Sequence, residues 1–185
     1  MSRIILGIDP GTSVTGYGII SCEGKKMTLI SCGVIQVGKY KLSHAEKLKK
    51  IFERTSALIR EYKPSEMAVE APFQGKNIQA TLKLGRAQGV AMTAAMINDI
   101  PVSEYAPRKV KMAVTGKGTA SKEQVASMLE NLFKFEEKVS FMDATDGLAV
   151  AVCHFYQGNA LPSSSGGKKG WSSFLKDNPG RIKKR

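Results

Sequence analysis

Four acidic residues next to apolar segments are the part of this sequence best suited to chemistry. Asp9 ends an apolar run at residues 4–8, Glu70 ends the short segment EMAVE, and Asp143 and Asp146 precede a further apolar run. Carboxylates that converge repel one another unless a cation compensates them. Because no His or Cys stands beside these acids, the set suits Mg²⁺ or Mn²⁺ rather than zinc. Four convergent carboxylates can hold two such ions about 4 Å apart, as in attack on a phosphodiester.

Plain structural roles are the alternative for some of these acids. An aspartate in a Pro-Gly-Thr turn can cap its own backbone, and this would account for Asp9. An acid in the first turn of a helix is stabilised by the helix dipole. That effect explains Asp143 well and explains Asp146, which is followed by Gly147 in an apolar helix, less well. It does not extend to Glu70.

The elements that would position the acids follow from periodicity and turn signals. Residues 4–20 predict a hairpin, residues 27–37 a third strand, and Ser43 with Glu46 a capping box that begins a helix ending before Pro64. A crossover through this helix would place the strand at residues 66–71 parallel to the first strand, so that Asp9 and Glu70 end side by side. The remaining prediction is a helix at 78–98, a strand at 102–105, and helices from Pro107, Ser121 and Asp143. The order βββαβαβααα predicts an α/β fold, a mixed five-stranded sheet flanked by helices.

The amino-acid composition limits which classes of protein this chain can belong to. The chain has 185 residues, 42% of them apolar, and a formal charge of +12, which favours a polyanionic partner such as nucleic acid. We expect one domain at residues 1–161 and a basic, disordered tail at residues 162–185, where low apolar content opposes folding. Three scattered cysteines, no apolar run of membrane-spanning length and no signal-peptide pattern favour a cytoplasmic protein without a membrane partner.

Basic residues gather between the predicted fifth strand and the last helix. From Arg108 to Lys122 there are five basic residues and no acid: Arg108, Lys109, Lys111, Lys117 and Lys122. A solvated helix face is the plain explanation, but the flexible Gly116-Lys117-Gly118 turn is also suited to gripping a phosphate. Lys76, in the loop FQGKN after the second acid, is a similar candidate. Phe73 in that loop is either a lid over the core or an aromatic face for a base.

Three segments carry a family resemblance. GIDPGTSVTGYG, VEAPFQGKNIQATLKLGRAQGVA and DATDGLAVAVCH, in this order, resemble the RuvC family of Holliday junction resolvases from Arg3 to about Asn159. The resemblance implies the ribonuclease-H-like fold, with Asp9, Glu70, Asp143 and Asp146 as catalytic acids that bind two Mg²⁺ ions, for which Mn²⁺ can substitute. Some relatives have histidine in place of Asp143. The resemblance also places Lys111 and Lys122 beside the scissile backbone, and stacks Phe73 on an unpaired base.

The expected partners follow from this resemblance: four-way junction DNA, a second copy of the chain, and branch-migration helicase proteins. Two symmetric nicks in a two-fold symmetric junction call for two active sites, hence a C₂ dimer. The helix around Gly85 and Gly89, with Met92 and Met96, is the candidate dimer surface. Ordinary packing of that helix onto the sheet is the alternative.

Three other functions share some of these features. An Asp-x-Gly-Thr turn also opens the actin and sugar-kinase ATPase fold, but that fold needs about twice this length. A branched-DNA-binding module without catalysis would not need four acids. A nuclease acting on RNA–DNA hybrid would need them and is distinguished by substrate. The sequence predicts a hydrolase, a structure-selective endodeoxyribonuclease that resolves four-way junctions by paired nicks.

Overall fold

The computed structural model describes residues 3–38, 42–73, 77–134 and 142–159 of the chain. The strands are β1 (Arg3–Asp9), β2 (Val14–Glu23), β3 (Lys26–Gln36), β4 (Glu66–Glu70) and β5 (Val102–Tyr105). The helices are α1 (His44–Tyr62), α2 (Ile78–Met96), α3 (Pro107–Thr115), α4 (Lys122–Phe133) and α5 (Met142–Asn159). The predicted element order is therefore confirmed. The expected tail and Lys76 lie outside the described residues.

One mixed sheet with strand order β3-β2-β1-β4-β5 forms the centre of the structure. The first three strands form the antiparallel meander, and β4 and β5 add in parallel. The register pairs Ile8 of β1 with Val69 of β4, one residue before each strand ends in its acid. The crossover predicted from the sequence thus brings Asp9 and Glu70 to the same edge of the sheet.

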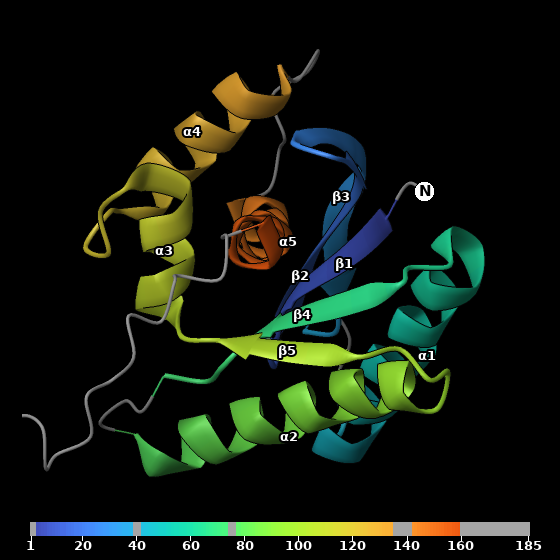
Figure 1. Ribbon diagram of the computed structural model, residues 1–185. Coiled ribbons are helices and arrows are strands. Elements are labelled where there is room, and N and C mark those ends of the chain that lie inside the picture. Colours follow the sequence, from blue (N-terminus) through green and yellow to red (C-terminus); the bar gives the residue numbers. More distant parts are fainter. Residues whose placement is uncertain (1–2, 39–41, 74–76, 135–141, 160–185) are drawn as a thin grey trace, which may run out of the picture.

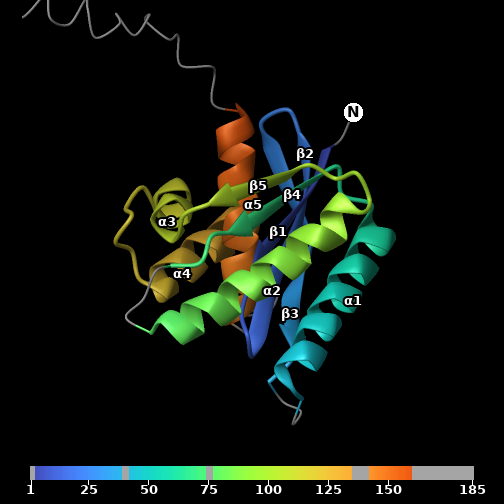
Figure 2. The same cartoon turned by 90° about the horizontal axis from the view of Figure 1, so that it is seen from below.

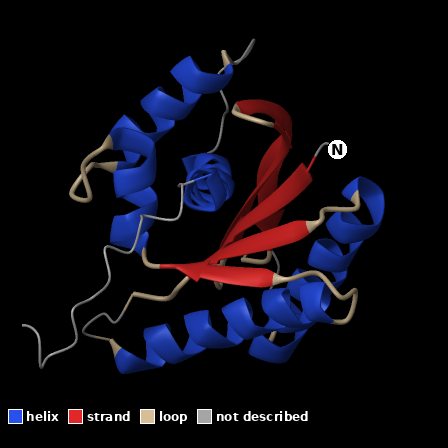
Figure 3. Cartoon of the chain, viewed as in Figure 1, coloured by secondary structure: helices blue, strands red, loops and turns tan. Residues whose placement is uncertain are grey.

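Helices cover the sheet on both faces, as Figures 1 and 3 show. Helices α1 and α2 lie on one face of the sheet, the face turned toward the viewer in Figure 2. Helix α5 lies on the other face, with α3 and α4 outside it. Alternate strand residues supply the two cores, since side chains point to opposite faces in turn. Leu6, Ile8 and Val69 pack towards α1 and α2, whereas Ile5 and Ala68 pack towards α5.

Two capping boxes begin helices at their predicted positions. In the first, the Glu46 amide donates to Ser43 Oγ at 3.3 Å and the Ser43 amide donates to Glu46 Oε2 at 2.7 Å. Ser121 and Gln124 exchange the same two bonds at the start of α4. Each box satisfies amides that the first turn leaves without helical partners. The second one also fixes where Lys122, the first residue of α4, leaves the helix.

Main chain packs directly on main chain where α5 crosses the sheet. A Cβ atom on Gly16 of β2 would overlap the carbonyl oxygen of Asp143, and one on Gly147 would lie 2.5 Å from the backbone of Gly16 and Tyr17. Real Cβ atoms do not approach other atoms so closely, so only glycine fits at either position. This contact sets the start of α5, and with it Asp143 and Asp146, against the strands that carry Asp9.

No helix in the described part of the chain combines the length and apolar character that crossing a membrane requires. The three cysteines are free thiols, with Cys22 and Cys153 buried and Cys32 half-buried.

Candidate active site

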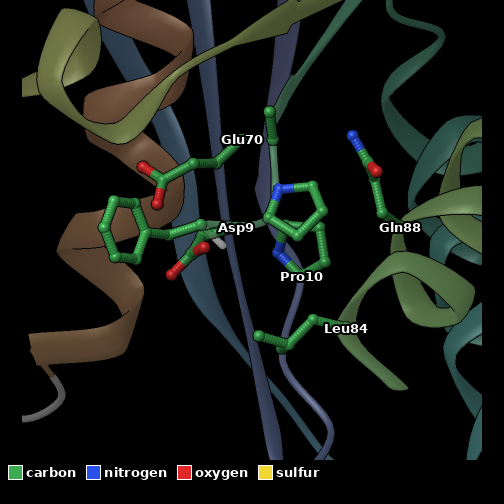
Figure 4. A pocket seen from close by; sticks show the side chains of 8 residues that line it. Asp9, Pro10, Glu70, Leu84 and Gln88 are labelled. Atoms are coloured by element: carbon green, nitrogen blue, oxygen red, sulfur yellow. The ribbon is translucent and has the colours of Figure 1, made fainter. Parts of the chain in front are cut away.

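Asp9 and Glu70 form the centre of the site, at the adjoining ends of β1 and β4. Figure 4 shows their carboxylates close together, with Pro10 and Leu84 beside them. The turn after Asp9 is fixed by Thr15, whose hydroxyl donates to the Gly11 carbonyl at 3.0 Å and accepts from the Gly11 amide at 3.2 Å. A buried threonine thus holds the turn that Asp9 would otherwise have to cap.

Asp146 reaches the same place from α5. It lines a cavity of about 60 Å³ together with Asp9 and Glu70, and Lys111 and Lys122 close the cavity from α3 and α4. Asp143 does not line this cavity; its side chain is 47% exposed, against 14% for Asp146. The structure therefore brings three of the four predicted acids into one cavity and leaves Asp143 at its rim.

Burial and mutual repulsion make the acid cluster reluctant to ionise. The pKa of Asp9 is raised to about 7, mainly by burial and then by the neighbouring Asp146 and Asp143, while Lys122 lowers it. The pKa of Glu70 is raised to about 8, mainly by burial and then by Asp9 and Asp146, while Lys122 and Lys111 lower it. The site therefore has too few positive charges to balance its carboxylates.

Lys122 lies among the acids rather than apart from them. Its Nζ donates to Asp146 Oδ2 at 2.5 Å and stands 3.9 Å from Asp143 Oδ1. Although burial lowers it, the pKa of Lys122 is raised overall, because the hydrogen bond to Asp146 and the surrounding carboxylates favour the charged form. The sequence predicted this lysine as a phosphate contact, without its ion pairs to the acids.

The donor set fits a hard divalent cation. Its oxygens are all carboxylate, they face one small cavity, and they are short of positive charge, which are the conditions that Mg²⁺ and Mn²⁺ satisfy. As the side chains of the described residues stand, no three of His, Cys, Asp or Glu are placed to hold a metal ion together. The Lys122 ammonium is instead the cation held against this cluster.

The other predicted DNA contacts lie around this cavity in different ways. Lys111 lines it, whereas Arg108 and Lys117 are exposed on α3 and the turn that follows. Phe73 is 73% exposed, so the alternative of a lid over the core is wrong. The role of its ring toward a base stays a prediction.

A second cavity, of about 140 Å³, opens on the other side of the Asp9–Glu70 pair. Phe73, Pro10 and Pro72 line it with Leu84 and Gln88 of α2. Gln88 is buried, and its Nε2 donates to Glu104 Oε2 at 2.7 Å. The sequence analysis did not identify Leu84 or Gln88. The available signal was a glutamine at a position spaced like the buried residues of a helix rich in small side chains.

Acids at the ends of neighbouring strands, joined by a third from a helix that crosses the sheet, define a ribonuclease-H-like nuclease. The family model "Crossover junction endodeoxyribonuclease RuvC" matches residues 5–154. The chain belongs to the RuvC family.

Individual relatives agree with this assignment over nearly the whole chain. A protein of the same description from Cytophaga hutchinsonii is 56% identical over 183 residues, covering 99% of this chain and 90% of the relative. One from Porphyromonas gingivalis is 51% identical and covers 98% of this chain and 97% of the relative. Among solved structures, Thermus thermophilus RuvC in complex with Holliday junction substrate superposes with a TM-score of 0.76 at 30% identity, covering 84% of this chain and 94% of that one.

Proposed function

We propose that this protein is a structure-selective endodeoxyribonuclease that resolves four-way DNA junctions by paired symmetric nicks. One observation carries the proposal: in a member of the RuvC family, Asp9, Glu70 and Asp146 line a single cavity that two lysines close. Buried acids beside cations are suited to phosphodiester hydrolysis, where charge develops on phosphate oxygens.

The proposed cofactor is Mg²⁺, two ions per site, with Mn²⁺ as the substitute. Asp9, Glu70 and Asp146 would hold the ions, with Asp143 contributing from the rim. When bound, such ions supply charge stabilisation to the reacting phosphoryl group and help to ionise the attacking water. The structural support is a cluster of acids whose burial, together with their mutual repulsion, raises the pKa of Asp9 to about 7 and that of Glu70 to about 8.

The basic and aromatic residues around the site would position the DNA. Lys111 faces the acids across the cavity and is placed to contact a phosphate that enters it. Arg108 and Lys117 lie further out and would bind the continuing backbone. The exposed ring of Phe73 offers a stacking face for a base beside the scissile phosphate.

A substrate comparison tests the proposed function. Four-way junction, linear duplex and RNA–DNA hybrid of matched sequence are incubated with the protein in Mg²⁺ or in EDTA. We expect symmetric nicks in the four-way junction with Mg²⁺ only, and none after Asp9→Asn. Asp99→Asn, which changes an exposed acid at the far end of α2, is the matched control and should cut normally. Preferential cutting of the hybrid, or junction binding without cutting, would overturn the proposal.

We further propose that α2 forms the dimer surface. Its outward face carries the exposed apolar side chains Ile78, Leu82 and Met96, and added Cβ atoms on Gly85 and Gly89 would meet nothing within 4 Å. The open space at both glycines favours this proposal over their packing onto the sheet, whereas Met92, the other residue predicted for this surface, packs against the core. Small residues flanked by apolar ones let a second helix approach closely.

Mixed subunits test the dimer. Wild-type and Asp9→Asn subunits are mixed and allowed to exchange before junction is added. Heterodimers should nick one strand and seldom complete resolution. Paired cuts in proportion to the wild-type protein would show that each chain works alone.

A further inference from the structure

The position of Lys122 has a consequence for how the site changes when a divalent ion binds. Lys122 is the first residue of α4, and its side chain is 54% exposed along its length while its Nζ reaches into the acid cluster. An ammonium at a helix N-terminus opposes the helix dipole. The acids, not the helix, therefore hold Lys122 in place.

Among the described residues, Lys122 is the cation paired with this cluster. It bonds Asp146, stands 3.9 Å from Asp143, and lines one cavity with Asp9 and Glu70. A single positive charge balances these acids only in part, so a divalent ion has more to offer the same oxygens.

The bond between Lys122 and Asp146 uses a ligand that the proposed metal site also needs. Asp146 Oδ2 accepts from Nζ at 2.5 Å, so a divalent ion at that oxygen would lie next to the ammonium and be repelled by it. The lysine stem is long and partly exposed, so its head group can leave the cluster without moving α4. Cation and ammonium therefore compete for one position.

We propose that Lys122 is the counter-ion of the metal-free acid cluster and that a divalent ion displaces it toward the DNA. This inference rests on the metal site of the proposed function. Displacement moves a positive charge from Asp146 to the mouth of the cavity, where a phosphate of the backbone can pair with it. Ion loading thereby prepares the phosphate contact, and the same lysine serves both states in turn.

Metal affinity without DNA tests the exchange. Lys122→Met keeps the length of the stem and removes the charge, and Lys47→Met on α1, beyond the other face of the sheet, is the matched control. Calorimetric titration with Mn²⁺ should show affinity about tenfold higher or more for Lys122→Met than for wild type, since one competing charge interaction is gone. Lys47→Met should match wild type. Unchanged or weaker Mn²⁺ binding by Lys122→Met would overturn the proposal.

Lysine reactivity supplies a second readout on the unmutated protein. Acetylation is followed by mass spectrometry at Lys122 and Lys47, in EDTA and in Mg²⁺. Reactivity at Lys122 should rise several-fold when Mg²⁺ is added and stay constant at Lys47. A fall or no change at Lys122 would overturn the exchange. Neither readout uses cleavage, so a protein that exchanges Lys122 but leaves junctions uncut would refute the proposed function and retain this inference.

Discussion

Two glutamates on one short strand, Glu66 and Glu70, have opposite surroundings. They stand four residues apart on β4 and therefore point to the same face of the sheet. Glu66 Oε2 is hydrogen-bonded to His154 Nε2 at 2.6 Å, and Glu66 Oε1 lies 3.6 Å from the Arg3 guanidinium. The other ring nitrogen of His154, Nδ1, is hydrogen-bonded to the Tyr105 hydroxyl at 2.8 Å. Glu70 instead faces Asp9 and Asp146, and its pKa is raised to about 8 by burial and by these acids.

This difference separates a carboxylate that holds the fold from one that is available for chemistry. Around Glu66, two hydrogen bonds and the ion pair with Arg3 form a network that joins β1, β4, β5 and α5, so both of its carboxylate oxygens have a partner. Around Glu70 the positive charges are too few to balance the carboxylates, so a cation from solvent can bind there. Residue type and burial alone do not distinguish the two; the sign of the neighbouring charges does.

Removing the charge of each glutamate in turn should reveal the largest difference between them in cleavage activity. Glu70→Gln should lower junction cleavage by about 10³-fold or more, the effect of losing several kcal/mol of transition-state stabilisation at a metal-binding acid. Glu66→Gln, the same change four residues earlier on β4, should leave the cleavage rate within a few-fold of wild type. Single-turnover cleavage and junction binding are measured together. Equal losses of binding and cleavage in Glu70→Gln would mean that Glu70 holds the fold instead.

Stability should respond in the opposite order. Glu66→Ala leaves the buried His154 without its carboxylate and should cost about 1–3 kcal/mol of unfolding free energy. Glu70→Ala relieves repulsion and should leave the metal-free protein equally stable or more so. Urea titration in EDTA measures both variants. A larger loss for Glu70→Ala than for Glu66→Ala would contradict the division of roles.

Two aromatic residues sharpen the same contrast. Tyr105 is 8% exposed and belongs to the Glu66 network, whereas Phe73 is 73% exposed near Glu70. Phe73→Ala should therefore change the melting temperature little and lower junction cleavage about tenfold, the worth of one base stack. Tyr105→Phe, which loses the bond to His154, should do the reverse. A large fall in melting temperature for Phe73→Ala would show that the ring packs in the fold.

The pH dependence of the metal-free protein should show the smallest effect. An acid whose folded pKa is raised binds more protons folded than unfolded, so stability falls as pH rises between the two values. For Asp9 and Glu70 this interval runs from about 4 to pKa values of about 7 and 8. The melting temperature in EDTA should drop by about 3 °C or more from pH 5 to pH 8. Glu70→Gln should flatten the drop, and an unchanged slope would contradict the assignment.

Much of the fold could be predicted because its signals are local. Ser43 with Glu46 and Ser121 with Gln124 mark helix starts within four residues. The meeting of Asp9 and Glu70 follows from the right-handed crossover rule and strand-end positions, so part of the site was also within reach.

The remaining features depend on packing between distant segments. His154 meets Glu66 across 88 residues, and Lys122 meets Asp146 across 24, because α4 and α5 pack at an angle that no local pattern specifies. The sequence around His154 therefore indicates no partner for it. Leu84 and Gln88 were missed for the same reason, since their facing the acids depends on how α2 lies on the sheet.

Direct contact between the backbones of α5 and β2 gives the site mechanical stiffness. No side-chain torsion stands between Gly16 and the Asp143 carbonyl or Gly147, so rotamer changes cannot alter the spacing there. Atoms already in van der Waals contact resist further approach, and close-packed interiors compress very little. Hydrostatic pressure would therefore deform the exposed loops around the site before it changed the separation between the acids of α5 and the strand that carries Asp9.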